Sequence, residues 1–207
     1  MSALLPREGF NTKFSVPTVE LRPGLWWRLA LRNRPKLLDW DGRPGETRFV
    51  SGEGGYEILY LASDKMTAFW EVFGGRLLPL VPEDRVLPPA VMAQRHWVAF
   101  DVTAIFSVFD ATRISAVREI GASNMSFHGD WSVSQTWGRA LWHHPAAIDG
   151  ILYRSDKNAL PCVALFHRRH QKHLVIKAKS HGLLADDGAF LTALRRKGLF
   201  AAGPEPR

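Results

Sequence analysis

The stretch Tyr56-Glu-Ile-Leu-Tyr-Leu-Ala-Ser-Asp-Lys-Met-Thr-Ala-Phe-Trp-Glu71 holds a strand, a helix cap and a helix in direct succession. Residues 57–62 are almost all apolar and predict a short buried strand. Ser63 or Asp64 can cap the next helix, because such a side-chain oxygen accepts a hydrogen bond from a free N–H of the first turn. The pair Gly74-Gly75 predicts the end of that helix. The chain thus passes from a strand straight into a helix.

Glu71 is the one acidic side chain within this helix. The helical period gathers the large apolar side chains into one stripe, formed by Met66, Phe69, Trp70 and Phe73. Glu71 lies roughly 150° from the centre of that stripe, which favours a surface position. Ala68 and Val72 flank it, however, and a helix this apolar favours cover on most sides. Periodicity therefore leaves two alternatives for Glu71, a solvated acid or the acid of a site.

The rest of the chain mixes strands and helices without a regular β-α-β alternation. Strand patterns cover residues 24–31, 95–102, 148–153, 161–167 and 173–179, and helix patterns cover residues 132–143 and 186–197. Ser132 and Gln135 match a capping box for the first of these helices. This order predicts a single α+β domain with a mixed or antiparallel β core and flanking helices. We expect a loose arm over residues 1–23, the main domain over 24–180, and a C-terminal helix with a basic tail over 181–207, packed on the same domain.

Composition favours a protein of the cytoplasm. The 207 residues can form one sizeable core, and 46% of them are hydrophobic. The one cysteine, Cys162, excludes an internal disulfide framework and suits a reducing compartment. The first residues lack the apolar core of a signal peptide, and no apolar run approaches the ~20 residues that span a bilayer.

The positive charge is concentrated near the C-terminus. The chain has a net charge of +7, and residues 166–207 alone hold nine Lys and Arg against three Asp and Glu. Such a segment can bind nucleic acid or an acidic protein, but it is more often a solvated surface. Aromatic residues are not interleaved with the basic ones, which argues against a platform for single-stranded nucleic acid. Direct nucleic-acid binding is therefore not expected.

Two arginines and one serine are candidate site residues. Arg28 lies in the middle of a predicted strand, where a charge needs either a buried counter-ion or a bound anion. Arg48 lies in a glycine-rich loop, where an arginine is usually solvated. Ser155 follows a predicted strand, a place from which side chains often reach a site. It has no nucleophile-elbow motif around it, so it is a poor candidate for a covalent nucleophile.

Other side chains give weaker signals. His167, His170 and His173 recur every third residue, but they fall on a predicted basic hairpin turn without an acid or cysteine, so we expect no metal site. Cys162 lies in an apolar strand and is expected in the core. Trp131, just before the capping box, could line a pocket.

Taken together, these pieces resemble the RES family, which is named for its Arg, Glu and Ser. The matching residues occur in the family's order: Arg28 in Trp-Trp-Arg, Arg48 in Thr-Arg-Phe, Tyr60 in Ile-Leu-Tyr-Leu-Ala, Glu71 in Ala-Phe-Trp-Glu, and Ser155 in Asp-Gly-Ile-Leu-Tyr-Arg-Ser. The segments Trp131-Ser-Val-Ser-Gln-Thr-Trp-Gly and Cys162-Val-Ala-Leu-Phe are also similar to later parts of the family. The resemblance covers roughly residues 24–170. One departure is Thr47, where the family often has glycine.

The resemblance implies a fold like that of ADP-ribosyltransferases and a bacterial toxin paired with a small DNA-binding antitoxin. Members destroy NAD, in characterised cases by phosphorolysis, so NAD is the substrate, inorganic phosphate the co-substrate, and no resident cofactor or metal is expected. Water or a macromolecule are alternative acceptors of ADP-ribose. A further alternative is a non-catalytic nucleic-acid-binding module that uses the basic C-terminal region. The resemblance leaves a homodimer open.

The same resemblance assigns a role to each matching residue. Glu71 would stabilise the positive charge that develops on the sugar when the nicotinamide–ribose bond breaks. Arg28 and Arg48 would bind a pyrophosphate or the attacking phosphate. The remaining residues would assist: Tyr60 would stack on the nicotinamide or a ribose, and Trp131 would line the substrate pocket. Ser155 would either orient Glu71 or donate a hydrogen bond to a ribose hydroxyl.

Overall fold

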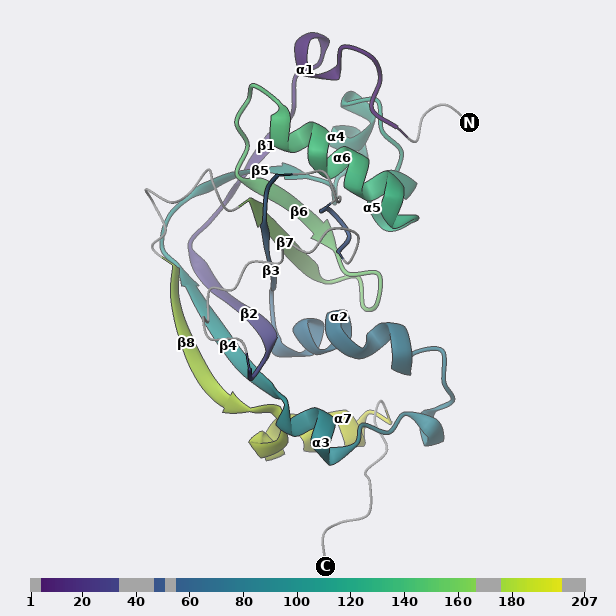
Figure 1. Ribbon diagram of the computed structural model, residues 1–207, viewed down its shortest axis with the longest axis vertical. Helices are drawn as coiled ribbons and strands as arrows, with labels where there is room; N and C mark the ends of the chain where they lie inside the picture. Colours follow the sequence, from purple (N-terminus) through teal and green to yellow (C-terminus); the bar gives the residue numbers. More distant parts are fainter. Residues whose placement is uncertain (1–4, 34–46, 51–54, 167–175, 199–207) are drawn as a thin grey trace, which may run out of the picture.

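The computed structural model describes residues 5–33, 47–50, 55–166 and 176–198, and Figure 1 shows one curved sheet with helices at both ends. The sheet has eight strands in the order β1-β5-β6-β7-β3-β2-β4-β8. The strands are β1 (Thr18–Leu21), β2 (Gly24–Leu31), β3 (Ile58–Ala62), β4 (Arg95–Val102), β5 (Phe106–Asp110), β6 (Gly150–Arg154), β7 (Pro161–Phe166) and β8 (Ile176–Leu183). All neighbours pair antiparallel except β5 and β6, which are parallel. The prediction of a single α+β domain with a mixed sheet is confirmed.

The described helices lie at the two ends of the sheet (Figure 1). They are α1 (Phe10–Lys13), α2 (Lys65–Leu77), α3 (Pro89–Ala93), α4 (Ile114–Glu119), α5 (Met125–His128), α6 (Trp131–His143) and α7 (Gly188–Arg196). Helices α4, α5 and α6 lie together near β5 and β6, whereas α2, α3 and α7 lie near the ends of β2 and β4. A ring contact between Phe69 of α2 and Phe190 of α7, with centroids 5.6 Å apart, joins the second group.

The sheet is buried on both faces. Alternate residues of β3 and β7 belong to two different apolar clusters, since Ile58 and Ala62 face the helices while Leu59 and Leu61 face the other side. Among the described residues, the fully buried members of the cluster on that other side all belong to strands. Burial on both faces explains why these strands are nearly continuous apolar runs in the sequence.

The sheet opens between β2 and β3. These two strands pair at one position only, Trp27 with Ala62, whereas β2 pairs with β4 along all eight of its residues. Beyond the single pair, the backbones of Leu29–Leu31 and of Tyr60 diverge, and both segments line the same cavity. The continuity of the sheet is thus interrupted at one place, next to the start of α2.

Helix α2 continues where the sequence predicts its end. Asp64 caps it as expected, its side chain accepting a hydrogen bond from the N–H of Thr67 at 2.8 Å. Gly74 and Gly75 do not stop the helix, because Gly74 accepts a regular hydrogen bond from the N–H of Leu78 at 3.0 Å. Both glycines adopt ordinary helical backbone angles rather than the left-handed ones of a helix end.

Two further expectations are wrong. The N-terminal segment is not a loose arm in its described part, because β1 pairs with β5 and Phe10 is buried in the main core. Ser132 is not the cap of α6. Asp130 caps that helix instead, accepting the N–H of Ser132 at 2.8 Å, since an aspartate one residue before the helix competes well for the same free donors.

The final helix, α7, is confirmed, with Asp187 as its cap. The predicted turn with His167, His170 and His173 lies outside the described residues. Within the described part of the chain, no helix is both long and apolar enough to cross a bilayer.

Gly138 of α6 touches the segment that contains Arg48. A Cβ atom at this glycine would lie 2.4 Å from the carbonyl oxygen of Phe49, which is backbone and cannot easily move. The close approach of α6 to residues 47–50 therefore requires glycine here.

Gly138→Ala is expected to lower the free energy of unfolding by about 1–3 kcal/mol, the usual cost of overpacking. Gly75→Ala is the matched control, because it makes the same change in a helix where nothing lies within 4 Å of the new methyl group. It should raise stability by up to about 1 kcal/mol through helix propensity. Urea unfolding followed by circular dichroism measures both. Equal stability of the two variants would contradict the close packing at Gly138.

Candidate active site

A cavity of about 680 Å³ opens where β2 and β3 separate. Its walls come from β2, β3, α2, the segment 47–48, the start of α6 and the turn between β6 and β7. Small molecules and cofactors occupy cavities of roughly 300–1,000 Å³. The cavity is therefore large enough for a nucleotide-sized ligand. We next ask which of the predicted site residues line it.

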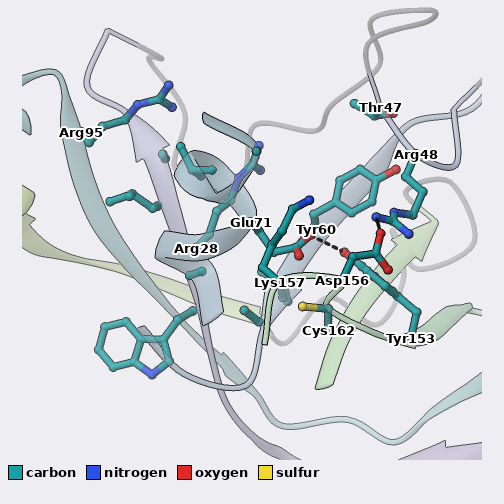
Figure 2. A pocket seen from close by; sticks show the side chains of 18 of the residues that line it. Arg28, Thr47, Arg48, Tyr60, Glu71, Arg95, Tyr153, Asp156, Lys157 and Cys162 are labelled. Atoms are coloured by element: carbon teal, nitrogen blue, oxygen red, sulfur yellow. Dashed lines mark hydrogen bonds and ion pairs between the residues drawn. The ribbon is translucent and has the colours of Figure 1, made fainter. Parts of the chain in front are cut away.

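Five of the six predicted site residues line this cavity: Arg28, Arg48, Tyr60, Glu71 and Trp131. The sixth, Ser155, is 2% exposed and lies behind the wall. Figure 2 shows Arg28, Arg48, Tyr60 and Glu71 converging from four different parts of the chain. The structure thus brings the predicted set together, although the role of each residue stays a prediction.

Glu71 is exposed to the cavity and held by two hydroxyl groups. Ser155 donates a hydrogen bond from its Oγ to Oε1 of Glu71 at 2.6 Å, and Tyr153 donates a longer one to Oε2 at 3.4 Å. Burial raises the pKa of Tyr153 well above its ordinary value, so this phenol remains a donor. The sequence left Glu71 as either a solvated acid or the acid of a site, and each alternative applies in part. Glu71 is exposed to solvent, but it is exposed within a cavity and its orientation is fixed.

Arg48 is positioned by its neighbour Phe49, which is fully buried. The backbone N–H of Phe49 donates to the hydroxyl of Tyr60 at 3.0 Å, and the two rings stack with centroids 6.3 Å apart. Gln135, which the sequence suggested as part of a capping box, instead donates its amide to the carbonyl of Thr47 at 2.9 Å. A buried phenylalanine and a glutamine from α6 thus fix the loop arginine at the cavity wall.

The charge of Arg48 is matched by Asp156. Its guanidinium forms an ion pair with the Asp156 carboxylate and donates to the carbonyl of Phe127 at 2.8 Å. The other oxygen of Asp156 contacts Nδ1 of His128 at 2.8 Å. Burial by itself raises the pKa of Asp156, but the hydrogen bonds from His128 and Arg48 outweigh it and hold that pKa below its ordinary value. Asp156 therefore stays charged and holds Arg48 in place.

The other predicted residues occupy distinct walls. Arg28 is half-buried in β2. The pKa of His96 on the adjacent strand is lowered first by the burial of His96 itself and then by the positive charge of Arg28. Trp131 is 47% exposed at the first position of α6 and presents its ring at the cavity. Tyr60 presents its hydroxyl edge to the Arg48 segment through the bond to Phe49.

The sequence did not identify five cavity residues: Arg76, Arg95, Tyr153, Asp156 and Lys157. Tyr153 could have been found, because it lies on β6 two residues before Ser155, which directly follows the strand, and residues two apart in an extended segment share a face. Asp156 and Lys157 directly follow Ser155 in a strand-end turn, which is a weaker signal. No sequence signal points to Arg76 and Arg95, since their position at the cavity depends on how α2 and β4 approach β2.

The cavity is rich in positive charge. Among its described lining residues, five are cationic, namely Arg28, Arg48, Arg76, Arg95 and Lys157, and two are acidic, namely Glu71 and Asp156. Like charges that line one cleft concentrate their field in it, so such a surplus attracts an anion more strongly than the same charges spread over an open surface. The arrangement suits a ligand with phosphate groups.

Cys162 also belongs to the cavity wall. Cys162 is 1% exposed, and burial together with the charge of Glu71 raises the pKa of its thiol, which therefore stays neutral and unreactive. No cluster of three or more His, Cys, Asp or Glu side chains that could bind a metal occurs among the described residues.

Comparisons with known proteins bear on the family and on the fold. The model of the RES domain matches residues 25–188. The fold is similar to that of a chain in the crystal structure of the M. tuberculosis MbcT–MbcA toxin–antitoxin complex, with a TM-score of 0.66 and 20% sequence identity over 92% of this chain and 98% of that chain. Among curated proteins, no sequence is a significant match.

Asp156→Asn is expected to lower the free energy of unfolding at pH 7 by about 1–3 kcal/mol, because Arg48 loses its counter-charge in a poorly solvated place. The folded-state pKa of Asp156 is lowered, so its contribution is present above the unfolded value of about 3.9 and is lost as the pH falls through the lower folded value. The difference from wild type should therefore shrink below pH 4. Urea unfolding between pH 7 and pH 3 measures it.

Asp84→Asn, at an exposed position outside the cavity, is the matched control for the loss of one carboxylate. If Asp156→Asn were as stable as Asp84→Asn at pH 7, the ion pair would contribute nothing to the fold.

Proposed function

The chain belongs to the RES domain family, and on that premise we propose that it is a toxin enzyme that destroys NAD. The proposed reaction cleaves the nicotinamide–ribose bond and transfers ADP-ribose to inorganic phosphate or to water. The observation that carries the proposal is the Glu71 carboxylate, fixed by Ser155 at 2.6 Å and facing a cavity with a surplus of positive charge. The partner that we propose is a DNA-binding antitoxin, in line with the toxin–antitoxin complex to which the similar fold belongs.

The bond that breaks joins C1 of the nicotinamide ribose to the ring nitrogen. Its electron pair leaves with nicotinamide, which is cationic in NAD and becomes neutral, so no strong general acid is required. An oxygen of phosphate forms the new bond to C1 and gives ADP-ribose 1-phosphate. With water as the acceptor the products are ADP-ribose and a proton.

Glu71 stabilises the transition state of this reaction. As the bond breaks, the sugar acquires oxocarbenium character and a positive charge, as it does in glycoside cleavage. A carboxylate that is already oriented need not reorganise when that charge appears, which is the main source of electrostatic catalysis. Ser155 and Tyr153 supply this orientation and leave the face of the carboxylate toward the cavity.

The cationic walls bind the phosphates of the dinucleotide. Arg28 and Arg48 present planar guanidinium groups, which suit phosphate oxygens. Tyr60 and Trp131 present aromatic rings to the same cavity, on which nicotinamide or adenine can stack.

The first test is turnover of NAD by the purified protein, with and without phosphate, followed by separation of the products. Wild type should release nicotinamide, and Glu71→Gln should lower the rate at least about a hundredfold, the range for removing one group that stabilises transition-state charge. Glu83→Gln, at an exposed position in the turn after α2, is the matched control and should behave as wild type.

Two results would count against this function. Absence of nicotinamide release from folded protein under both conditions would overturn it. Release accompanied by label from NAD on protein or nucleic acid would favour an ADP-ribosyltransferase that modifies a macromolecule instead.

Ser155→Ala should lower kcat about tenfold, which corresponds to the loss of one hydrogen bond of about 1.4 kcal/mol to a charged group, with little change in the KM for NAD. Tyr153→Phe is the comparison, because its bond to Glu71 is longer and its removal should cost less. A kcat for Ser155→Ala equal to that of wild type would remove the positioning role of Ser155.

A further inference from the structure

The turn between β6 and β7 lies along α2 and contacts it at three positions along the helix axis. The amide of Asn158 donates to Oγ1 of Thr67 at 3.0 Å in the first turn of the helix, and Ser155 donates to Glu71 in the middle. The aliphatic stem of Lys157 lies against Gly74, one turn further on. The turn is thus aligned with the helix, and the place of each of its side chains is determined.

Gly74 is the residue that makes room for Lys157. A Cβ atom at Gly74 would lie 2.9 Å from Cγ and 3.1 Å from Cδ of Lys157. A glycine inside a helix costs about 1 kcal/mol relative to alanine. At Gly74, unlike at Gly75, a larger side chain would meet the stem of Lys157. This contact places the lysine beside Glu71, because residues three apart on a helix are surface neighbours.

Lys157 and Arg76 bring positive charges to the cavity that no acid among the described residues neutralises. Both residues line the cavity, and neither side chain forms a hydrogen bond or ion pair with another described residue. Arg48 differs, since Asp156 already pairs with it. Figure 2 shows Lys157 and Glu71 both pointing into the cavity, with Arg48 and Asp156 on one side of them and Arg95 on the other.

We propose that Lys157 and Arg76 form an anion subsite next to Glu71 that binds a phosphate group of the reactants, and that Gly74 exists to let Lys157 reach it. The proposal rests on the proposed function for the identity of the reactants. An ammonium group on a stem packed against the helix binds phosphate oxygens at a low cost in side-chain entropy. The phosphate group belongs either to inorganic phosphate or to the diphosphate of the dinucleotide, and both present the same oxygen chemistry.

Binding titrations of the full chain separate the two sources without turnover. One arm uses inorganic phosphate alone, and the other uses ADP, which has the diphosphate without the reactive ribose. Lys157→Met keeps the aliphatic stem and removes the charge, so Kd should rise about tenfold or more in the arm that matches the true ligand. Arg76→Met is an independent second variant with the same expected direction, and circular dichroism confirms that each variant is folded.

Three further variants make the test specific. Lys157→Arg should stay within about threefold of wild type, because the charge is kept. Lys13→Met removes a lysine from α1, far from the cavity, and should leave Kd unchanged. Gly74→Ala should raise the same Kd while Lys157 is still present, because the new methyl group displaces its stem.

The outcomes distinguish this subsite from the enzymatic activity. An unchanged Kd in both arms for folded Lys157→Met and Arg76→Met overturns the subsite, as does a wild type that binds neither ligand, whatever the rate of NAD turnover. Binding that depends on Lys157 in a protein that does not cleave NAD supports the subsite and overturns the activity. In an active protein, a KM for phosphate that rises in Lys157→Met while the KM for NAD stays constant identifies inorganic phosphate as the ligand.

Discussion

The separation of β2 from β3 is the constraint on which the site depends. A sheet strand normally satisfies its backbone groups with both neighbours, and β2 does so with β4 along its whole length. On the other side it pairs with β3 only at Trp27 and Ala62. Because the strands diverge from there, Arg28 and Tyr60 can both reach one cavity, and α2, which begins three residues after the single pair, places Glu71 at its wall. A sheet paired continuously at this point would have no cavity to line.

The sequence predicts the parts of this arrangement that depend on local patterns. Residues 56–71 specify a strand, a cap and a helix, and the structure has each of them, because apolar runs and capping chemistry act within a few residues. The resemblance to the RES family adds the set of Glu71, Arg28 and their companions. Two local predictions failed because a distant contact overrode a local preference. Gly74 accommodates Lys157 instead of ending helix α2. Gln135 binds the carbonyl of Thr47 instead of capping helix α6. Asp156 and Lys157 could not be placed beforehand, because their partners are up to 108 residues away along the chain.

The charged groups of the cavity divide into those that are fixed and those that are available. Arg48 and Asp156 neutralise each other, so their pairing contributes more to shape than to attraction. Glu71 is held by two neutral hydroxyls, which orient a carboxylate without cancelling its charge. Lys157 and Arg76 have no such counter-charge among the described residues. The Arg48–Asp156 pair therefore contributes less to the electrostatic field of the cavity than Glu71, Lys157 and Arg76 do.

The turn between β6 and β7 has a consequence for how this chain can vary. Strand-connecting turns usually tolerate changes of length, because few contacts depend on them. Here four consecutive residues, 155 to 158, each engage a different group: Glu71, Arg48, the backbone surface at Gly74, and Thr67. One inserted residue would shift all four contacts together while the strands on either side stayed paired. A relative with a longer turn would keep the same sheet and lose this constellation, so the length of the turn is a better sign of a shared site than similarity of fold.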